Sequence, residues 1–278
     1  LTGSILPDDV SQLSFRSDVY GELKGNCPTT LPQDIFCQHK RIFGTESDLD
    51  NFNITGMDLS EGDFSSATWY NVYGKLSSCP TTMPDGWGCV EENGLILGPG
   101  INYQNMTQAD FPNNFDSSSI SFENTAFPDD LLFKGWKTDV RTCPGMLPVK
   151  YTCITTEIGD NYIIGPYIDF DSADMMGIEI DPPDLDGVFG SFYICPILSQ
   201  SLVAKGYGCS QNTNNHILGP NVNLDQVDLN SIENKLPQHI SLHGASYHGN
   251  ILIEENSNFC DSIKQLAEQS IGINHDYN

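Results

Sequence analysis

Cys143-Pro-Gly-Met-Leu-Pro-Val-Lys-Tyr-Thr-Cys153, with Ile163-Ile-Gly-Pro166 ten residues further on, is the stretch that decides the fold. The same pattern occurs four times: a Cys-Pro pair, a second cysteine, and then an Ile-apolar-Gly step. Its copies begin at Cys27, Cys79, Cys143 and Cys195. An internal repeat of this kind indicates that the fold is built from repeated structural units.

The spacing of the copies indicates two rounds of duplication. The Cys-Pro pairs are 52, 64 and 52 residues apart, and the Ile-apolar-Gly steps are 54, 67 and 54 apart. The segment 48–59 also aligns with the segment 169–180. We therefore expect a first β domain at 1–125 and a second at 126–244, each made of two units. Residues 245–278 would hold a fifth lead-in strand, a helix and a tail.

Each unit predicts strands rather than helices. Short patches of alternating apolar residues, bounded by Gly, Pro and Asp, precede each first cysteine and surround each Ile-apolar-Gly step. About eight short strands per pair of units are typical of a β-sandwich. The predicted fold class is all-β, with two tandem sandwich-like domains of duplicated, disulfide-stapled units. One short amphipathic helix is expected at 261–272.

Eight of the nine cysteines lie in close pairs, which fits an oxidising compartment. Zinc is the rival explanation, but zinc knuckles have two residues between cysteines, and here the gap is eight or more. We predict four disulfides, each worth about 3 kcal/mol in the chain-entropy model. They pair Cys27 with Cys37, Cys79 with Cys89, Cys143 with Cys153, and Cys195 with Cys209.

Composition narrows the choice of partners and of compartment. A formal charge of −25 makes nucleic acid and anionic lipid poor partners, and no apolar run approaches the length of a membrane span. The chain starts at Leu1 without a basic-then-apolar leader, which suggests a processed or internal start. Asn53-Ile-Thr55 and Asn105-Met-Thr107 are N-glycosylation acceptors. Together these features predict a secreted or cell-surface glycoprotein, with glycans on Asn53 and Asn105.

No cofactor is predicted, but Ca²⁺ remains an alternative. Polar oxygens recur at matched places after each Ile-apolar-Gly step and could bind Ca²⁺, although EF-hand spacing is absent. They could equally cap turns through local backbone bonds. These positions are Asp48, Asn102, Asp169 and Asn223, then Asp50, Gln104, Asp171 and Asp225, with Asp174 beside the third set.

The sequence carries no motif of a catalytic nucleophile, a metalloprotease or a phosphate loop, and we predict that it is not an enzyme. His239, His243 and His248 form the densest reactive cluster. The first and second of them could share a strand face and bind zinc, but solvent-facing histidines explain them as well.

The ends of the array suggest a function. A fifth lead-in strand ends at Cys260, whose partner is missing, so the pattern stops with an open strand. Open strands in a head-to-tail array favour a non-closing assembly of identical copies by strand addition. In this character the chain resembles a cysteine-paired, N-glycosylated repeat protein of protist or algal surface filaments. Its assembly is similar to that of strand-complemented pilus subunits, although no pilin motif matches.

We therefore predict the structural subunit of an extracellular filament, with further copies of itself and N-linked glycans as partners. The alternative is a secreted monomeric lectin-like protein that binds carbohydrate or Ca²⁺. Its sugar platforms would be Trp69, Trp87 and Trp136.

Overall fold

A computed structural model describes residues 1–13, 19–171, 173–182, 184–210 and 215–224 of the chain. These residues form two compact units. Unit 1 comprises residues 1–112, 119–131 and 141–146, and unit 2 comprises residues 113–118, 132–140 and everything from 147 onward that the structure describes. Each unit is described below by itself.

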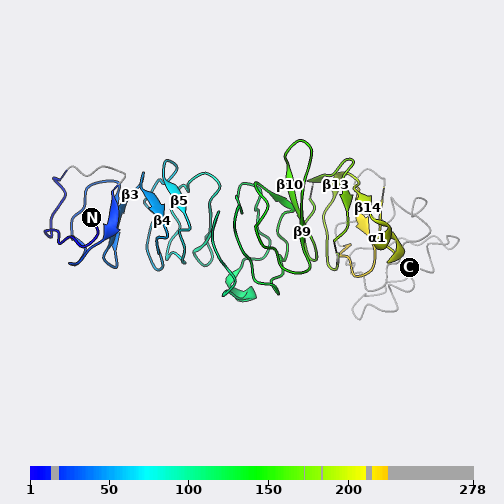
Figure 1. The fold of residues 1–278 in the computed structure, drawn as a ribbon, viewed down its shortest axis with the longest axis horizontal. Coiled ribbons are helices and arrows are strands. Elements are labelled where there is room, and N and C mark those ends of the chain that lie inside the picture. The colour runs from blue at the N-terminus through cyan, green and yellow to red at the C-terminus, as the bar shows by residue number, and fades with distance from the viewer. Residues whose placement is uncertain (14–18, 172, 183, 211–214, 225–278) are drawn as a thin grey trace, which may run out of the picture. The chain divides into compact units, whose positions relative to one another are not determined.

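The described residues are built from short strands, which confirms the all-β prediction (Figure 1). Unit 1 contains one 3-10 helix, η1 (Gln108–Asp110), and seven strands: β1 (Tyr20–Glu22), β2 (Ile35–Gln38), β3 (Arg41–Gly44), β4 (Asp48–Asp50), β5 (Thr68–Tyr70), β6 (Gly88–Val90) and β7 (Leu95–Leu97). The described part of unit 2 contains helix α1 (Gln200–Ala204) and nine strands: β8 (Asp139–Val140), β9 (Thr152–Thr155), β10 (Asn161–Ile164), β11 (Ala173–Asp174), β12 (Glu179–Ile180), β13 (Phe192–Ile194), β14 (Ile197–Leu198), β15 (Gly208–Cys209) and β16 (Ile217–Leu218).

The four sequence copies form four antiparallel hairpins of the same register. They are β2–β3, β6–β7, β9–β10 and β15–β16. In each, the second cysteine of the pair lies opposite the isoleucine of the Ile-apolar-Gly step: Cys37 and Ile42, Cys89 and Ile96, Cys153 and Ile163, Cys209 and Ile217. The repeat seen in the sequence is therefore a repeat of backbone pairing.

Between the hairpins the chain coils, and it pairs in parallel with itself about one coil later. Asp48 pairs with Thr68 in the β4–β5 pair, and Asp58 bridges Ser78 (Figure 1). In unit 2, Asp169 bridges Phe189, and β11 pairs in parallel with β13. All of these partners are 19 or 20 residues apart in the chain. Parallel pairing at a fixed offset of this size is the geometry of a β-solenoid coil.

A five-residue period explains the coil of unit 1. One row of buried side chains recurs at every fifth position: Leu49, Ile54, Leu59, Phe64 and Trp69. After a buried centre the chain turns, as where the Met57 N–H donates to the Ile54 carbonyl at 3.1 Å. Gly56 takes the positive φ of +73° that the third position of a type II turn needs. Four such segments, from Leu49 to Trp69, make one coil whose apolar row lies in the core of unit 1.

Two ladders show three successive coils joined side by side. In unit 1, Asn102, Ala126 and Met146 are consecutive bridge partners, and in unit 2 Lys137, Asp169 and Phe189 are. The segment around the central residue of each ladder forms backbone hydrogen bonds with the coil before it and with the coil after it. The Asp169 N–H donates to the Trp136 carbonyl at 2.9 Å, and the Phe170 N–H donates to the Phe189 carbonyl at 2.9 Å. Each coil thus bonds to an earlier coil on one edge and to a later coil on the other.

Some details of the prediction differ from the structure. The expected sandwich layering is not confirmed, because the described strands form sheets of only two or three members joined by parallel bridges. Short apolar patches before each first cysteine were expected to form strands, but the patch at 131–136 before Cys143 forms none, and β8 lies just after it. Helix α1, inside the longer fourth loop, was not predicted. The expected helix at 261–272 lies outside the described residues. None of the described helices has the length and apolar content of a membrane span.

Candidate functional site

The predicted disulfides are present. Bonds join Cys27 to Cys37, Cys79 to Cys89 and Cys195 to Cys209, and both Cys143 and Cys153 are disulfide-bonded as well. Each bond ties the start of a proline-containing loop to the strand that faces the Ile-apolar-Gly step. Cys260 lies outside the described residues.

An aromatic ring covers the glycine of this step in three of the hairpins. A Cβ at Gly98 would lie 2.3 Å from the Trp87 ring, and a Cβ at Gly165 would lie 2.3 Å from the Tyr151 ring. At Gly219 the distance to the Tyr207 ring would be 2.1 Å. Only glycine leaves room for a ring at these places. The aromatic residues two positions before the second cysteine in these three copies are therefore packing residues.

The Tyr151 hydroxyl fixes its ring in place. It donates to the Pro166 carbonyl at 2.7 Å and accepts from the Phe133 N–H at 2.9 Å. Burial raises the pKa of Tyr151 well above its ordinary value, because the ionised form would lose its contact with water. This tyrosine is a neutral, two-way hydrogen-bonding group and holds two segments of unit 2 together.

Three of the nine candidate calcium ligands cap turns instead. The Asn102 Oδ1 accepts from the Gln104 N–H at 2.9 Å, and the Asp169 Oδ1 accepts from the Asp171 N–H at 3.0 Å. The Asp174 Oδ1 accepts from the Met176 N–H at 3.2 Å. This is the local turn motif that aspartate and asparagine form two residues before a donor. Asn102 and Asp169 hold matched positions in the second and third copies, so the cap accounts for the polar oxygen at both.

A lysine ammonium occupies the densest of these carboxylate pairs. The Lys137 Nζ lies 3.1 Å from the Asp169 Oδ2 and 3.0 Å from the Asp171 Oδ2. Across the described residues, no three His, Cys, Asp or Glu side chains cluster closely enough to hold a metal ion. The carboxylates at 169 and 171 thus share one ammonium, which comes from a neighbouring coil of unit 2. Asp225, the last member of the set, is outside the described residues.

The three tryptophans are buried. Trp69, Trp87 and Trp136 are 4%, 6% and 1% exposed. Trp69 packs edge-on against Trp87 at 5.5 Å between ring centres, and Trp136 packs against Phe133 at 4.7 Å. Their faces are filled by protein, so these rings cannot serve as the sugar platforms of a lectin.

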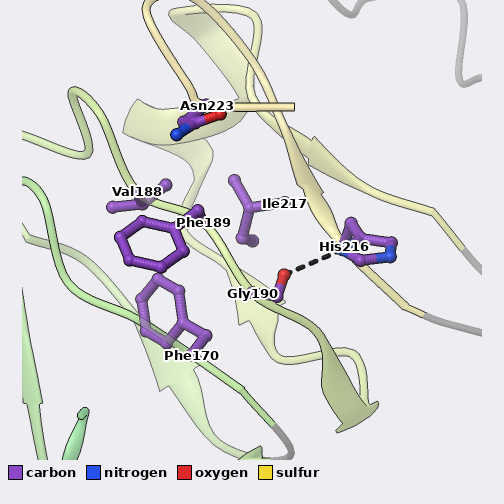
Figure 2. Close-up of a pocket in the computed structure, with 7 residues that line it drawn as sticks. All are labelled: Phe170, Val188, Phe189, Gly190, His216, Ile217 and Asn223. Carbon is purple, nitrogen blue, oxygen red and sulfur yellow. Dashed lines mark hydrogen bonds between the residues drawn. The ribbon is translucent and has the colours of Figure 1, made fainter. Parts of the chain in front are cut away.

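The described part of unit 2 contains a narrow pocket beside β16 (Figure 2). It is lined by Phe170, Val188, Phe189, Gly190, His216, Ile217 and Asn223, and the space between them is too small for a water molecule. His216 is buried, and its Nδ1 lies 2.8 Å from the Gly190 carbonyl. This is a packed histidine rather than a catalytic one. It stands directly before Ile217, the residue opposite Cys209.

Acid should loosen the fourth hairpin through His216. Burial lowers the pKa of His216, although the bond to Gly190 opposes this. Its folded-state pKa thus lies below its unfolded value of about 6.5, so the neutral ring stabilises the fold fully above that pH and loses this contribution as the pH falls.

We expect the free energy of unfolding to drop between pH 7 and pH 5, and His216→Phe to reduce the drop. Urea denaturation at pH 5, 6 and 7 measures it. The control is His39→Gln, at an exposed turn, and equal drops in all three proteins would contradict the expectation.

Asp139 is the least satisfied carboxylate of the described residues. Its Oδ1 is buried without a hydrogen-bond partner there. Burial raises the pKa of Asp139, the charges of Asp116 and Asp160 raise it further, and Lys137 opposes them. Ionised Asp139 therefore costs the fold stability at neutral pH.

Asp139→Asn should stabilise the protein at pH 7 by about 0.5 kcal/mol, a value kept small because the carboxyl is partly exposed. Since the folded-state pKa of Asp139 is raised, its penalty appears as the pH rises through that pKa, and the gain should vanish near pH 3. Thermal unfolding at both pH values tests this. The matched control, Asp58→Asn at an exposed capping position, should give no gain. Equal stability of Asp139→Asn and wild type at pH 7 would show that Asp139 carries no penalty.

The structure places both glycosylation acceptors in unit 1. Asn105 is exposed, and Asn53 is half-buried. Glycosylation at either residue remains a prediction. His239, His243 and His248 lie outside the described residues.

The residues that sequence reasoning missed are Lys137, Asp139 and His216. No local motif marks them, because their partners come from other coils. His216 had one signal in the sequence. It directly precedes the recurring isoleucine of the Ile-apolar-Gly step, a place held by Arg41, Leu95 and Tyr162 in the other copies.

Comparison of the chain with protein-family models, with curated proteins and with solved structures gives no match.

Proposed function

We propose that this chain is the structural subunit of an extracellular glycoprotein filament, in which copies join head to tail by adding the edge of one coil to the edge of the next. The observation that carries the proposal is the single direction of the parallel ladders in both units. The four disulfide pairs fit an oxidising compartment outside the cytoplasm.

A ladder with one direction has two different edges. Ala126 shows this in unit 1. Its N–H and C=O bond to the earlier coil at Ile101 and Tyr103, whereas the adjoining Phe127 N–H bonds to the later coil at Met146. To continue the parallel ladder, an edge of this kind must meet the opposite edge of another copy. Such a heterologous contact produces a chain of subunits rather than a closed dimer.

Asp9 presents one such edge in unit 1. It bridges Thr30 through its neighbours: the Val10 N–H donates to the Thr30 carbonyl at 3.0 Å, and the Thr30 N–H donates to the Asp8 carbonyl at 3.1 Å. The N–H and C=O of Asp9 itself point to the other side, as alternation along a strand requires. Among the described residues they have no backbone partner.

Apolar side chains of the same region are exposed. Ile5, Leu13 and Tyr20 are 71%, 48% and 48% exposed. Exposed apolar residues of this kind mark interaction surfaces, and these three lie near in the chain to the Asp9 backbone groups that have no partner among the described residues. Contact with another copy would cover the apolar side chains and pair the backbone groups of Asp9.

Two variants at Asp9 test the joint. Asp9→Pro removes the outward N–H and leaves the Val10 bond to Thr30, because proline is tolerated on an edge strand. Asp9→Ala removes the carboxylate and keeps that N–H. By sedimentation velocity, wild type and Asp9→Ala should form large assemblies, and Asp9→Pro should remain monomeric. A wild-type protein that stays monomeric at every concentration refutes the function, and an Asp9→Pro protein that assembles normally refutes this joint.

A further inference from the structure

The acceptor Asn53 has its amide held by its own triplet. The Asn53 Oδ1 accepts from the Thr55 N–H at 2.9 Å. Because the amide oxygen faces the backbone, the Nδ2 atom, which carries the sugar in N-glycosylation, lies on the opposite side of the amide group. The geometry thus leaves the modifiable atom of this half-buried asparagine turned away from its hydrogen bond.

Tyr73 lies beside Asn53 on the next coil of unit 1. The two residues form a parallel bridge, in which the Ile54 N–H donates to the Tyr73 carbonyl at 3.0 Å and the Tyr73 N–H donates to the Phe52 carbonyl at 3.0 Å. Paired residues of adjacent parallel strands project to the same face, about 4.8 Å apart. Tyr73 is 47% exposed. An exposed aromatic ring is therefore the immediate neighbour of the acceptor.

Gly74 lets the backbone after Tyr73 lie close to the acceptor triplet. Its φ is +127°, and a Cβ there would lie 2.4 Å from the Thr55 Oγ1. The hydroxyl of the acceptor triplet therefore packs directly against the backbone that follows Tyr73. The triplet and the ring are held in one local arrangement.

We propose that an N-linked glycan on Asn53 rests its first sugar on the ring of Tyr73, so that the glycan stabilises the β4–β5 coil of unit 1. One face of an N-acetylglucosamine ring presents C–H groups, and the face of a tyrosine ring is negatively polarised and apolar. Stacking covers both, while the tyrosine hydroxyl stays in water. The inference rests on the glycoprotein part of the proposed function.

Asn105 provides the contrast within the same unit. It is exposed, and Thr107 of its triplet is engaged in the cap of η1, where the Thr107 Oγ1 donates to the Asp110 Oδ2 at 2.9 Å. The aromatic residue two positions earlier, Tyr103, is 1% exposed, and its hydroxyl bonds to the Ile96 carbonyl at 2.8 Å. A glycan on Asn105 gains no support from that ring.

The test uses the full chain carrying Asn105→Gln, produced in a eukaryotic host with and without a block of N-glycosylation. Mass spectrometry reads the occupancy of Asn53, and calorimetry reads Tm. We expect Asn53 to be occupied and its glycan to raise Tm by about 2 °C. The rise should be lost in Tyr73→Thr and kept in Tyr70→Thr, since Tyr70 is equally exposed but pairs with Asp50. The protons of the first sugar should shift upfield only when Tyr73 is present.

An unoccupied Asn53, an absent rise in Tm, or a rise that survives in Tyr73→Thr would each overturn the proposal. Its failure is distinguishable from that of the filament. A monomeric protein that shows the Tyr73-dependent rise would refute assembly and leave the glycan seat standing. A protein that assembles but shows no Tyr73-dependent rise in Tm would refute the glycan proposal and leave the filament standing.

Discussion

Gly165→Ala is expected to lower the free energy of unfolding by about 3 kcal/mol, the upper range for forcing an extra methyl group into a packed site. The new Cβ would lie 2.3 Å from the Tyr151 ring. The ring cannot step aside cheaply, because its hydroxyl is bonded to the Pro166 carbonyl and to the Phe133 N–H. Chemical denaturation of the full chain measures the loss.

Two companion variants separate this clash from a general cost of alanine. Gly145→Ala is the control, since Gly145 is exposed and its nearest neighbour would lie 3.3 Å from the Cβ. It should cost far less. The double variant Gly165→Ala/Tyr151→Ile should recover part of the loss, because the first copy already pairs Ile35 with Gly44. A Gly165→Ala protein as stable as wild type would contradict the packing described for all three aromatic hairpins.

Removal of one staple should cost a similar amount. Cys79→Ala/Cys89→Ala opens a loop with a sequence separation of 10, and the chain-entropy model assigns about 3 kcal/mol to a loop of this length. The unfolding midpoint in urea should fall accordingly. Cys260→Ala, which leaves all four pairs intact, should leave it nearly unchanged. A loss below about 1 kcal/mol in the double variant would mean that the prolines, and not the bond, hold the loop.

Much of the hairpin architecture could be predicted from the sequence. The repeat of Cys-Pro pairs and Ile-apolar-Gly steps predicted four equivalent stapled β units, and the structure shows them at one register. Their pairing is local: Cys37 and Ile42 are five residues apart, so a single copy contains all the information needed. The same is true of the turn caps, where Asn102 bonds to a residue two positions later.

The coils between the hairpins were harder to predict for a physical reason. Apolar residues recur with a period of two in a strand and of about 3.6 in a helix, and a coil with corners has neither period. Its period is five, and the signal was present in Leu49, Ile54, Leu59, Phe64 and Trp69. Apolar residues at every fifth position predict a coil with corners rather than the strands of a sandwich.

The features of the candidate site depend on distant partners. Lys137 meets Asp169 across 32 positions, and the environment of Asp139 is set by Asp116 and Asp160. Which carboxylates are paired with a lysine and which lack a hydrogen-bond partner is decided only when coils stack. The burial of Trp69, Trp87 and Trp136 has the same origin, since each ring is covered by neighbouring segments.

X-ray diffraction from oriented assemblies of the full chain tests the filament most directly. If copies extend one another's parallel ladders, the spacing of about 4.8 Å between neighbouring strands should appear along the fibre axis. We predict fibres with this axial reflection. A protein that forms no fibres, or fibres in which that reflection lies across the axis, would contradict the account.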